Sequence, residues 1–242
     1  IKNSEEASLR VEKEFLQDYA PKKKIPLPTE DFSVIDFEID DPNETDSNGV
    51  TLLMKAAKNG NNWELDKLIK KGADVNKKDN QGWTALMYAC RYQESTEIVN
   101  KLINNGASIK DKNNYLLSAL NIASIYNGNP EILGLLLLRY VPSDTDVLNS
   151  LVMLLSDNST NEFSKLAKIK IFISKKVPLN TFYNGKTPLM YAAEFGNSTK
   201  VIKLLIESGA VTTIYSTEGK TAFDYAQQNI NLEHDEYYWL LN

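Results

Sequence analysis

The chain has 242 residues, of which 42% are hydrophobic, and its formal net charge is −5. This apolar content supports a packed fold and excludes a chain that is disordered throughout. The mild acidity argues against a general nucleic-acid-binding protein, and no apolar run approaches the roughly 18 residues of a membrane-spanning helix.

The first 45 residues are expected to form a helix followed by an irregular capping or linker segment (1–45). In residues 1–20, the apolar side chains of Leu9, Leu16 and Tyr19 recur at helical spacing, and Pro21 ends the pattern. Residues 21–45 carry further prolines and one short alternating run, which is typical of a connector. We expect this segment to cover the apolar end of the structure that follows.

A sequence repeat begins at Asp46. The segment that starts at Gly49 returns at Gly82, at Gly185 and at Gly219, and a threonine is the second residue after each of these glycines. Self-similarity at a fixed period of roughly 20–50 residues indicates stacked units rather than one globular core. Such an array usually offers one long surface to a partner.

Each unit is predicted to contain a turn and two helices. Asx residues and glycine form the turn, as in Asp46–Gly49, and the threonine that follows can cap the first helix. Paired small residues, such as Ala56 and Ala57, would let neighbouring first helices approach closely. The second helix ends in three units at a glycine suited to a left-handed position: Gly72, Gly106 and Gly209.

The recurring pattern Gly-x-Thr-x-Leu-x-x-Ala, together with Gly-Ala-Asp-Val-Asn at residues 72–76, resembles the ankyrin repeat. The units that begin at Asp46, Asp79, Tyr183 and Thr217 match specifically, and those around Ser118 and residues 144–180 match loosely. The resemblance implies an all-α fold, an ankyrin-type α-solenoid of about six helix-turn-helix repeats with short β-turn or hairpin fingers. We expect this repeat domain to cover residues 46–242.

The sequence departs from the family pattern in two ways. In the family, a histidine usually follows the motif's leucine, and its ring links neighbouring loops. Here that histidine is replaced, so the link must be absent or made differently. The residues in its place are Met54, Met87, Asn121, Met190 and Asp224. Tyr140 and Lys176 stand where a glycine should end the second helix, which costs about 1 kcal/mol if the left-handed cap is kept. Because Val141–Asp144 is too short for a full finger, we expect an irregular unit over about 141–180, with irregular stacking.

The sequence suggests no catalytic, cofactor or metal site. Two Gly-Lys-Thr triplets, at Gly185 and Gly219, resemble the end of a phosphate-binding loop, but the loop's earlier glycine is missing and the repeat explains both. His234 is the only histidine and Cys90 the only cysteine, which excludes multi-histidine and four-cysteine metal sites as well as an internal disulfide. Since Cys90 stands where other units carry alanine, we interpret it as a small buried residue.

Aromatic residues recur at one place in the first helices. Tyr92, Tyr126 and Phe195 each follow the paired small positions by two residues, and in the ankyrin family this place faces the concave groove. Arg91 and Glu194 stand beside Tyr92 and Phe195. Aromatic residues and arginine dominate interface hot spots, although rings at this place could equally complete the stack. The sequence leaves these two interpretations open.

Three further candidates are expected on the fingers. Trp83 lies between a finger glycine and a capping threonine, and we expect its side chain to be exposed at the turn tip; Lys186 and Lys220 occupy the same place in later units. Three other tyrosines are assigned to the core: Tyr88, Tyr191 and Tyr225.

The leading hypothesis is a non-catalytic module that binds a partner protein through the concave groove and the finger tips. The alternatives are a small-ligand-binding or enzymatic protein with a pocket at the irregular repeat 141–180, and a structural spacer within a longer chain.

We expect a monomer that binds no nucleic acid and does not insert into a membrane. A cytoplasmic location is favoured, while export to the periplasm is the alternative if an N-terminal signal was removed. The lysine-, asparagine- and isoleucine-rich composition indicates an AT-rich, bacterial genome.

Overall fold

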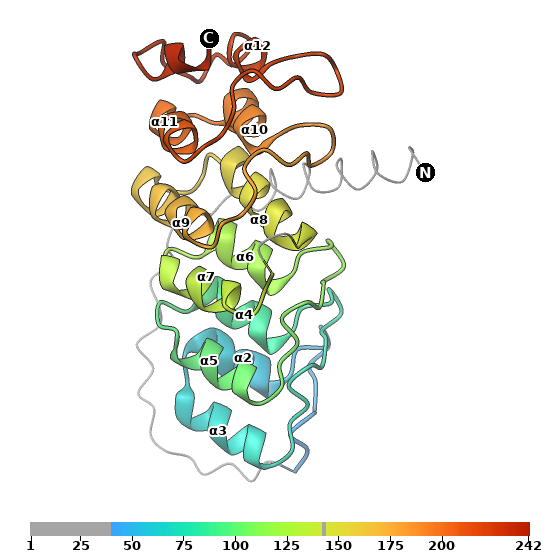
Figure 1. Ribbon diagram of the computed structural model, residues 1–242. Helices are drawn as coiled ribbons and strands as arrows, with labels where there is room; N and C mark the ends of the chain where they lie inside the picture. The colour runs from blue at the N-terminus through green and yellow to red at the C-terminus, as the bar shows by residue number, and fades with distance from the viewer. Residues whose placement is uncertain (1–39, 142–143) are drawn as a thin grey trace.

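The structure, a computed structural model, describes residues 40–141 and 144–242 (Figure 1). Within them the chain forms eleven α-helices, α2–α12, and one 3₁₀ helix, η1. In the same residues, strand-like pairing is confined to isolated bridges at the fingers, such as Tyr183 with Lys186. The all-α class is therefore confirmed.

The first helices of successive units form an inner row, in which each helix packs on the next (Figure 1). Ala57, Cys90 and Ala193 are fully buried in this row, and their small side chains let the backbones approach closely. The inner helices are α2 (Leu52–Asn59), α4 (Ala85–Tyr92), α6 (Ala119–Tyr126), α8 (Thr145–Ser156), α10 (Pro188–Phe195) and α12 (Ala222–Ala226).

The second helices of the units form an outer row beside the first. Each packs its apolar stripe inward: in α5, for example, Ile98, Val99 and Leu102 are buried while Asn104 is exposed. In the last unit η1 (Tyr238–Leu241) takes this place and packs on α11 and α12. The outer helices are α3 (Asn62–Lys70), α5 (Glu97–Asn104), α7 (Pro130–Leu137), α9 (Glu162–Ser174) and α11 (Thr199–Glu207).

Hydroxyl side chains cap five of the six inner helices, and four of them are the threonines that the sequence predicts. Each accepts a hydrogen bond from the backbone N–H three residues later, a cap that typically contributes about 1 kcal/mol; the caps are Thr51, Thr84, Ser118, Thr187 and Thr221. One substitute for the missing histidine also bridges units. The Asn121 side chain accepts from the Ser118 N–H at 2.8 Å and donates to the Ser150 hydroxyl of α8 at 2.8 Å.

The finger tips use a left-handed residue for their tight turn, and where consecutive fingers touch that residue must also lack a Cβ. At Gly82 (φ 78°), a Cβ would lie 2.7 Å from Asn114 Oδ1 of the next finger, whose backbone N–H donates to the Gln81 carbonyl at 3.0 Å. In the third finger Leu116 adopts the same conformation, with φ 62°. The next connection, residues 138–144, is too short to place a finger against it, and the Leu116 side chain is 50% exposed.

The irregular unit has a shortened turn, as predicted, but it does not interrupt the stack. Helices α8 and α9 have 12 and 13 residues, more than their counterparts, and α8 packs between α6 and α10. The expectation of irregular stacking is therefore wrong for the inner row, because α8 packs on both neighbours as the regular inner helices do. Lys176 keeps the left-handed conformation at φ 57°, whereas Tyr140 does not adopt it.

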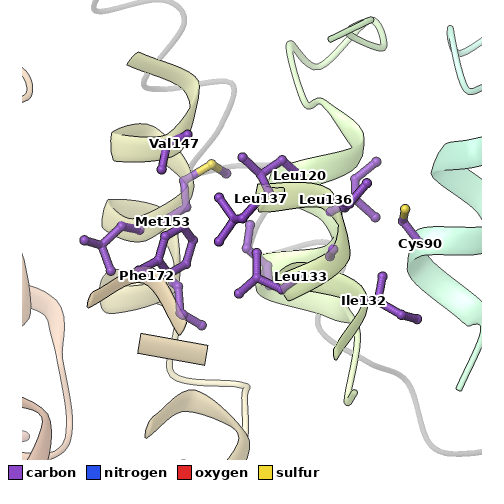
Figure 2. Close-up of a cluster of buried hydrophobic side chains, with 14 of the residues drawn as sticks. Cys90, Leu120, Ile132, Leu133, Leu136, Leu137, Val147, Met153 and Phe172 are labelled. Atoms are coloured by element: carbon purple, nitrogen blue, oxygen red, sulfur yellow. The ribbon is translucent and has the colours of Figure 1, made fainter. Parts of the chain in front are cut away.

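The core runs continuously through the middle of the stack. Figure 2 shows Cys90 of α4, Leu120 of α6, Leu133 of α7, Val147 of α8 and Phe172 of α9 in one cluster of buried side chains. Burial raises the pKa of the Cys90 thiol, which confirms its reading as a small buried residue rather than a reactive one.

Parts of the sequence prediction lie outside the described residues. The predicted N-terminal helix and nearly all of the capping segment fall within residues 1–39, so the division at residue 45 stays a prediction. No helix among the described residues is long and apolar enough to cross a lipid bilayer.

Candidate protein-binding surface

The eight residues that the sequence singles out fall into two clusters on the inner row. Four of them lie around α4 and the end of α6: Trp83, Arg91, Tyr92 and Tyr126. The other four lie around α10 and the finger that follows it: Lys186, Glu194, Phe195 and Lys220. We call these the α4 cluster and the α10 cluster.

Arg91 is the centre of the α4 cluster. Its guanidinium carbon lies 4.3 Å from the centroid of the Tyr126 ring, 5.5 Å from that of Tyr92 and 5.7 Å from that of Trp83. A cation over an aromatic face contributes about 0.5–2 kcal/mol, more as water is excluded. Since Tyr126 belongs to α6 and the other two rings to the preceding unit, the arginine links two units.

The expected exposure of Trp83 is wrong, because its side chain is only 5% exposed. The residue after a tip glycine lies on the return leg of the finger, which is bonded back to the first leg: the Trp83 N–H donates to Asp79 Oδ1 at 2.8 Å. The indole therefore turns onto the inner helix, with its ring centroid 5.4 Å from that of Tyr88. Trp83 supports the α4 cluster from beneath and is not a finger tip.

Tyr92 is the exposed member of the α4 cluster. Its side chain is 47% exposed, and its ring stacks on that of Tyr88, with centroids 6.4 Å apart and planes 18° apart. The Tyr88 hydroxyl donates to the Asp79 carboxylate at 2.8 Å, and burial together with this carboxylate raises the pKa of Tyr88. Tyr88 is thus half-buried rather than core, and it holds the Tyr92 ring in place.

The α10 cluster is closed by its own ion pairs. Lys186 Nζ lies 2.7 Å from Glu194 and 3.8 Å from Glu218, and 4.5 Å from the Tyr225 ring centroid. Burial alone would lower the pKa of Lys186, but the hydrogen bond and charge of Glu194 raise it. Its side chain is only 15% exposed, so the expected finger-tip lysine is held within the chain.

The neighbours of Lys186 complete this cluster. Lys220 lies 3.7 Å from Glu218 and 5.3 Å from the Tyr225 ring centroid, and the Phe195 ring packs 6.2 Å from that of Tyr191. Tyr191 and Tyr225 are buried, which confirms their assignment to the core.

Sequence reasoning missed a row of side-chain amides that join the units. Gln93, Asn127 and Asn229 each follow an inner helix and donate to the last carbonyls of the preceding inner helix; Asn127 Nδ2, for example, bonds Cys90 O at 2.9 Å and Gln93 O at 2.8 Å. Asn229 stands in its unit at the position of Tyr92, but it is buried in this row, and α12 is shorter than its counterparts. Gln93 and Asn127, which stand at the same phase of neighbouring units, were the available signal.

The irregular unit makes the same connection differently. Asp157 stands at the amide's place, and the donors to the end of α6 come from α9 and from the turn before it. Lys168 Nζ of α9 bonds Ser124 O at 2.8 Å, and Thr160 Oγ1 of the turn bonds Ile125 O at 3.0 Å. Lys168 is fully buried, and this burial lowers its pKa to about 8. A cation at a helix C-terminus interacts favourably with the helix dipole. Nothing in the sequence predicted this lysine.

An open hollow lies beside the α4 cluster. It has a volume of about 490 Å³ and is lined by Arg91, Tyr92, Gln93, Glu94 and residues 127–130. A second hollow lies beside Trp63 on α3. Among the described residues, no group of three or more His, Cys, Asp or Glu side chains is placed to hold a metal ion.

Comparisons with known proteins agree with this architecture. The family model for ankyrin repeats (3 copies) matches residues 31–113, 53–149 and 117–241. No curated protein matches the chain. Among solved structures, the human ASB11 ankyrin repeat domain is 25% identical, with a TM-score of 0.69 over 84% of this chain and 87% of that one.

A second solved structure resembles the chain in fold. It comes from the complex of the predatory endopeptidase Bd0816 of Bdellovibrio bacteriovorus with the immunity protein Bd3460. The matching chain is 24% identical, with a TM-score of 0.61 over 82% of this chain and 98% of that one.

Proposed function

Because this chain belongs to the ankyrin-repeat family, whose repeats generally act as protein-interaction modules, we propose that it binds a partner protein through its inner face. We define the inner face by the helix residues Arg91, Tyr92, Tyr126, Glu194 and Phe195. A standard interface buries roughly 1,200–2,000 Å² in total, which a row of six inner helices can supply.

The exposed Tyr92 ring is the observation that carries this proposal. It is 47% exposed, yet it is fixed by the stacked Tyr88 ring and flanked by Arg91. A rigid aromatic residue that is exposed before binding loses little conformational entropy in a complex, and such residues dominate interface hot spots. Tyr126 and Phe195, which are half-buried, would widen the contact around this anchor.

The role proposed is a non-catalytic one, as is typical of this fold. In the part of the irregular repeat 141–180 that the structure describes, the packing does not favour the alternative of a pocket. Leu154, Ile169 and Phe172 are fully buried between α8, α9 and their neighbours, and the two hollows noted above lie elsewhere.

Site-directed photo-crosslinking tests the proposal. A benzoylphenylalanine would replace Tyr92 on the inner face in one variant and Trp63, which is 58% exposed on the outer helix α3, in a control variant. We expect the first variant to capture a partner protein from the native lysate that the control does not capture. Capture by the Trp63 variant alone would contradict binding through the inner face.

A further inference from the structure

Two cationic groups flank the exposed Tyr92 ring. Lys58, in the last turn of α2, places its Nζ 5.1 Å from the ring centroid, and the Arg91 guanidinium carbon lies 5.5 Å from it. Lys58 is exposed, and within the described residues it makes no ion pair. The units that begin at Asp46 and Asp79, called units 1 and 2 below, therefore present an aromatic surface edged by positive charge.

Two carboxylates of these units are engaged elsewhere than at Lys58. Asp46 lies 3.0 Å from Lys55, one turn before Lys58. Asp79 is buried and accepts hydrogen bonds from the Tyr88 hydroxyl and from the backbone of its own finger. Glu94 is exposed and lines the same hollow as Arg91 and Tyr92.

The α10 cluster shows how this chain neutralises a lysine that lies beside aromatic rings. There a lysine also lies against aromatic rings, but two carboxylates neutralise it: Lys186 Nζ is 2.7 Å from Glu194 and 3.8 Å from Glu218. Lys58 likewise lies near a tyrosine ring, but it is exposed and forms no ion pair with a carboxylate of the described residues. A carboxylate from another molecule could pair with Lys58 as Glu194 pairs with Lys186.

We infer that units 1 and 2 recognise an acidic segment of the partner, with a carboxylate beside Lys58 and an apolar group on the Tyr92 ring. This inference rests on the proposed function and specifies the partner's chemistry. Hydrogen bonds between charged groups are about twice as strong as neutral ones, and complementary charge mainly sets specificity and association rate.

Peptide binding tests the inference. The probes are two fluorescein-labelled decapeptides with a central phenylalanine, one rich in glutamate and the other with every glutamate replaced by lysine. By fluorescence anisotropy we expect the acidic peptide to bind about tenfold more tightly. Lys58→Glu should weaken it about fivefold or more, whereas Lys70→Glu, the same charge change at an exposed site on α3, should change it less than about twofold.

Equal or undetectable binding of the two peptides would overturn the inference, as would equal losses in the two variants, because bulk charge would then explain the effect. Thermal unfolding of both variants checks that they remain folded. The proposed function can survive this failure. If a partner crosslinks through position 92 but its affinity is unchanged by Lys58→Glu, binding through the inner face stands and the preference for an acidic segment is wrong.

Discussion

Leu116 and Gly82 hold the same backbone conformation at successive finger tips, but their surroundings differ. Gly82 has φ 78°, and a Cβ there would lie 2.7 Å from Asn114 Oδ1. Leu116 has φ 62° and a side chain that is 50% exposed. A left-handed conformation costs a residue with a Cβ about 1–2 kcal/mol relative to the right-handed one. The third finger therefore carries local strain that glycine would relieve.

The matched pair Leu116→Gly and Gly82→Ala tests this account. We expect Leu116→Gly to raise the free energy of unfolding by up to about 1 kcal/mol, because the strain is relieved and little burial is lost. Gly82→Ala should lower it by more than about 1 kcal/mol, since strain and the clash with Asn114 add. Urea denaturation measures both. A destabilised Leu116→Gly would show instead that the leucine side chain makes a stabilising contact.

Local rules predicted the residues whose roles depend on their immediate neighbours. Thr84 and Thr187 cap helices because a hydroxyl beside a helix start can reach the third N–H, whatever the rest of the fold does. The predicted exposure of Trp83 was wrong because it depends on which way the return leg of the finger faces. Lys186 was placed at a tip for the same reason, and its carboxylate partners come partly from the next unit.

Between elements, the units are joined by side chains that reach the ends of neighbouring helices. In regular units one amide does this, as Asn229 does for α10 by donating to Ala193 O at 2.9 Å. In the irregular unit a buried lysine of α9 does it for α6. The repeat can be recognised in the sequence, but the replacement of the amide by a lysine cannot. The amide follows an inner helix, whereas Lys168 lies on the outer helix α9, so the two do not align in the repeat.

The buried Lys168 makes stability depend on pH. Its pKa is lowered to about 8 in the folded protein from 10.5, so between these values the unfolded chain binds a proton that the folded protein has lost. The free energy of unfolding therefore gains a contribution that rises with pH through this window. We expect this contribution to reach up to about 2 kcal/mol between pH 8 and pH 9.5.

The measurement compares the wild-type chain with Lys168→Met in urea at several pH values. Tyr88 and Tyr140 have raised pKa values and oppose the rise near pH 10, but they are common to both proteins and cancel in the difference. The variant should lack the rise between pH 8 and pH 9.5. Parallel pH profiles would mean that Lys168 titrates in the folded protein as it does in the unfolded chain.

At the scale of the whole molecule, the unbroken inner row brings distant residues onto one face. The row runs from α2 to α12, and the family and the all-α solenoid were predictable because the repeat recurs in phase along the chain. The two ends of the inner face differ in charge pairing. Lys186 is neutralised within the chain, while Lys58 and Tyr92 form an exposed surface. This difference could not be predicted from the repeat. The repeat shows where each polar residue stands in its unit, but it does not show which residue it pairs with.

The affinity of Tyr92→Ala for the crosslinked partner tests the central claim most directly. If the inner face is the binding surface, isothermal titration calorimetry should show a loss of about 2 kcal/mol or more in binding free energy, while the free energy of unfolding changes by less than about 1 kcal/mol. Unchanged affinity with a clear loss of stability would contradict the account, since Tyr92 would then only complete the stack.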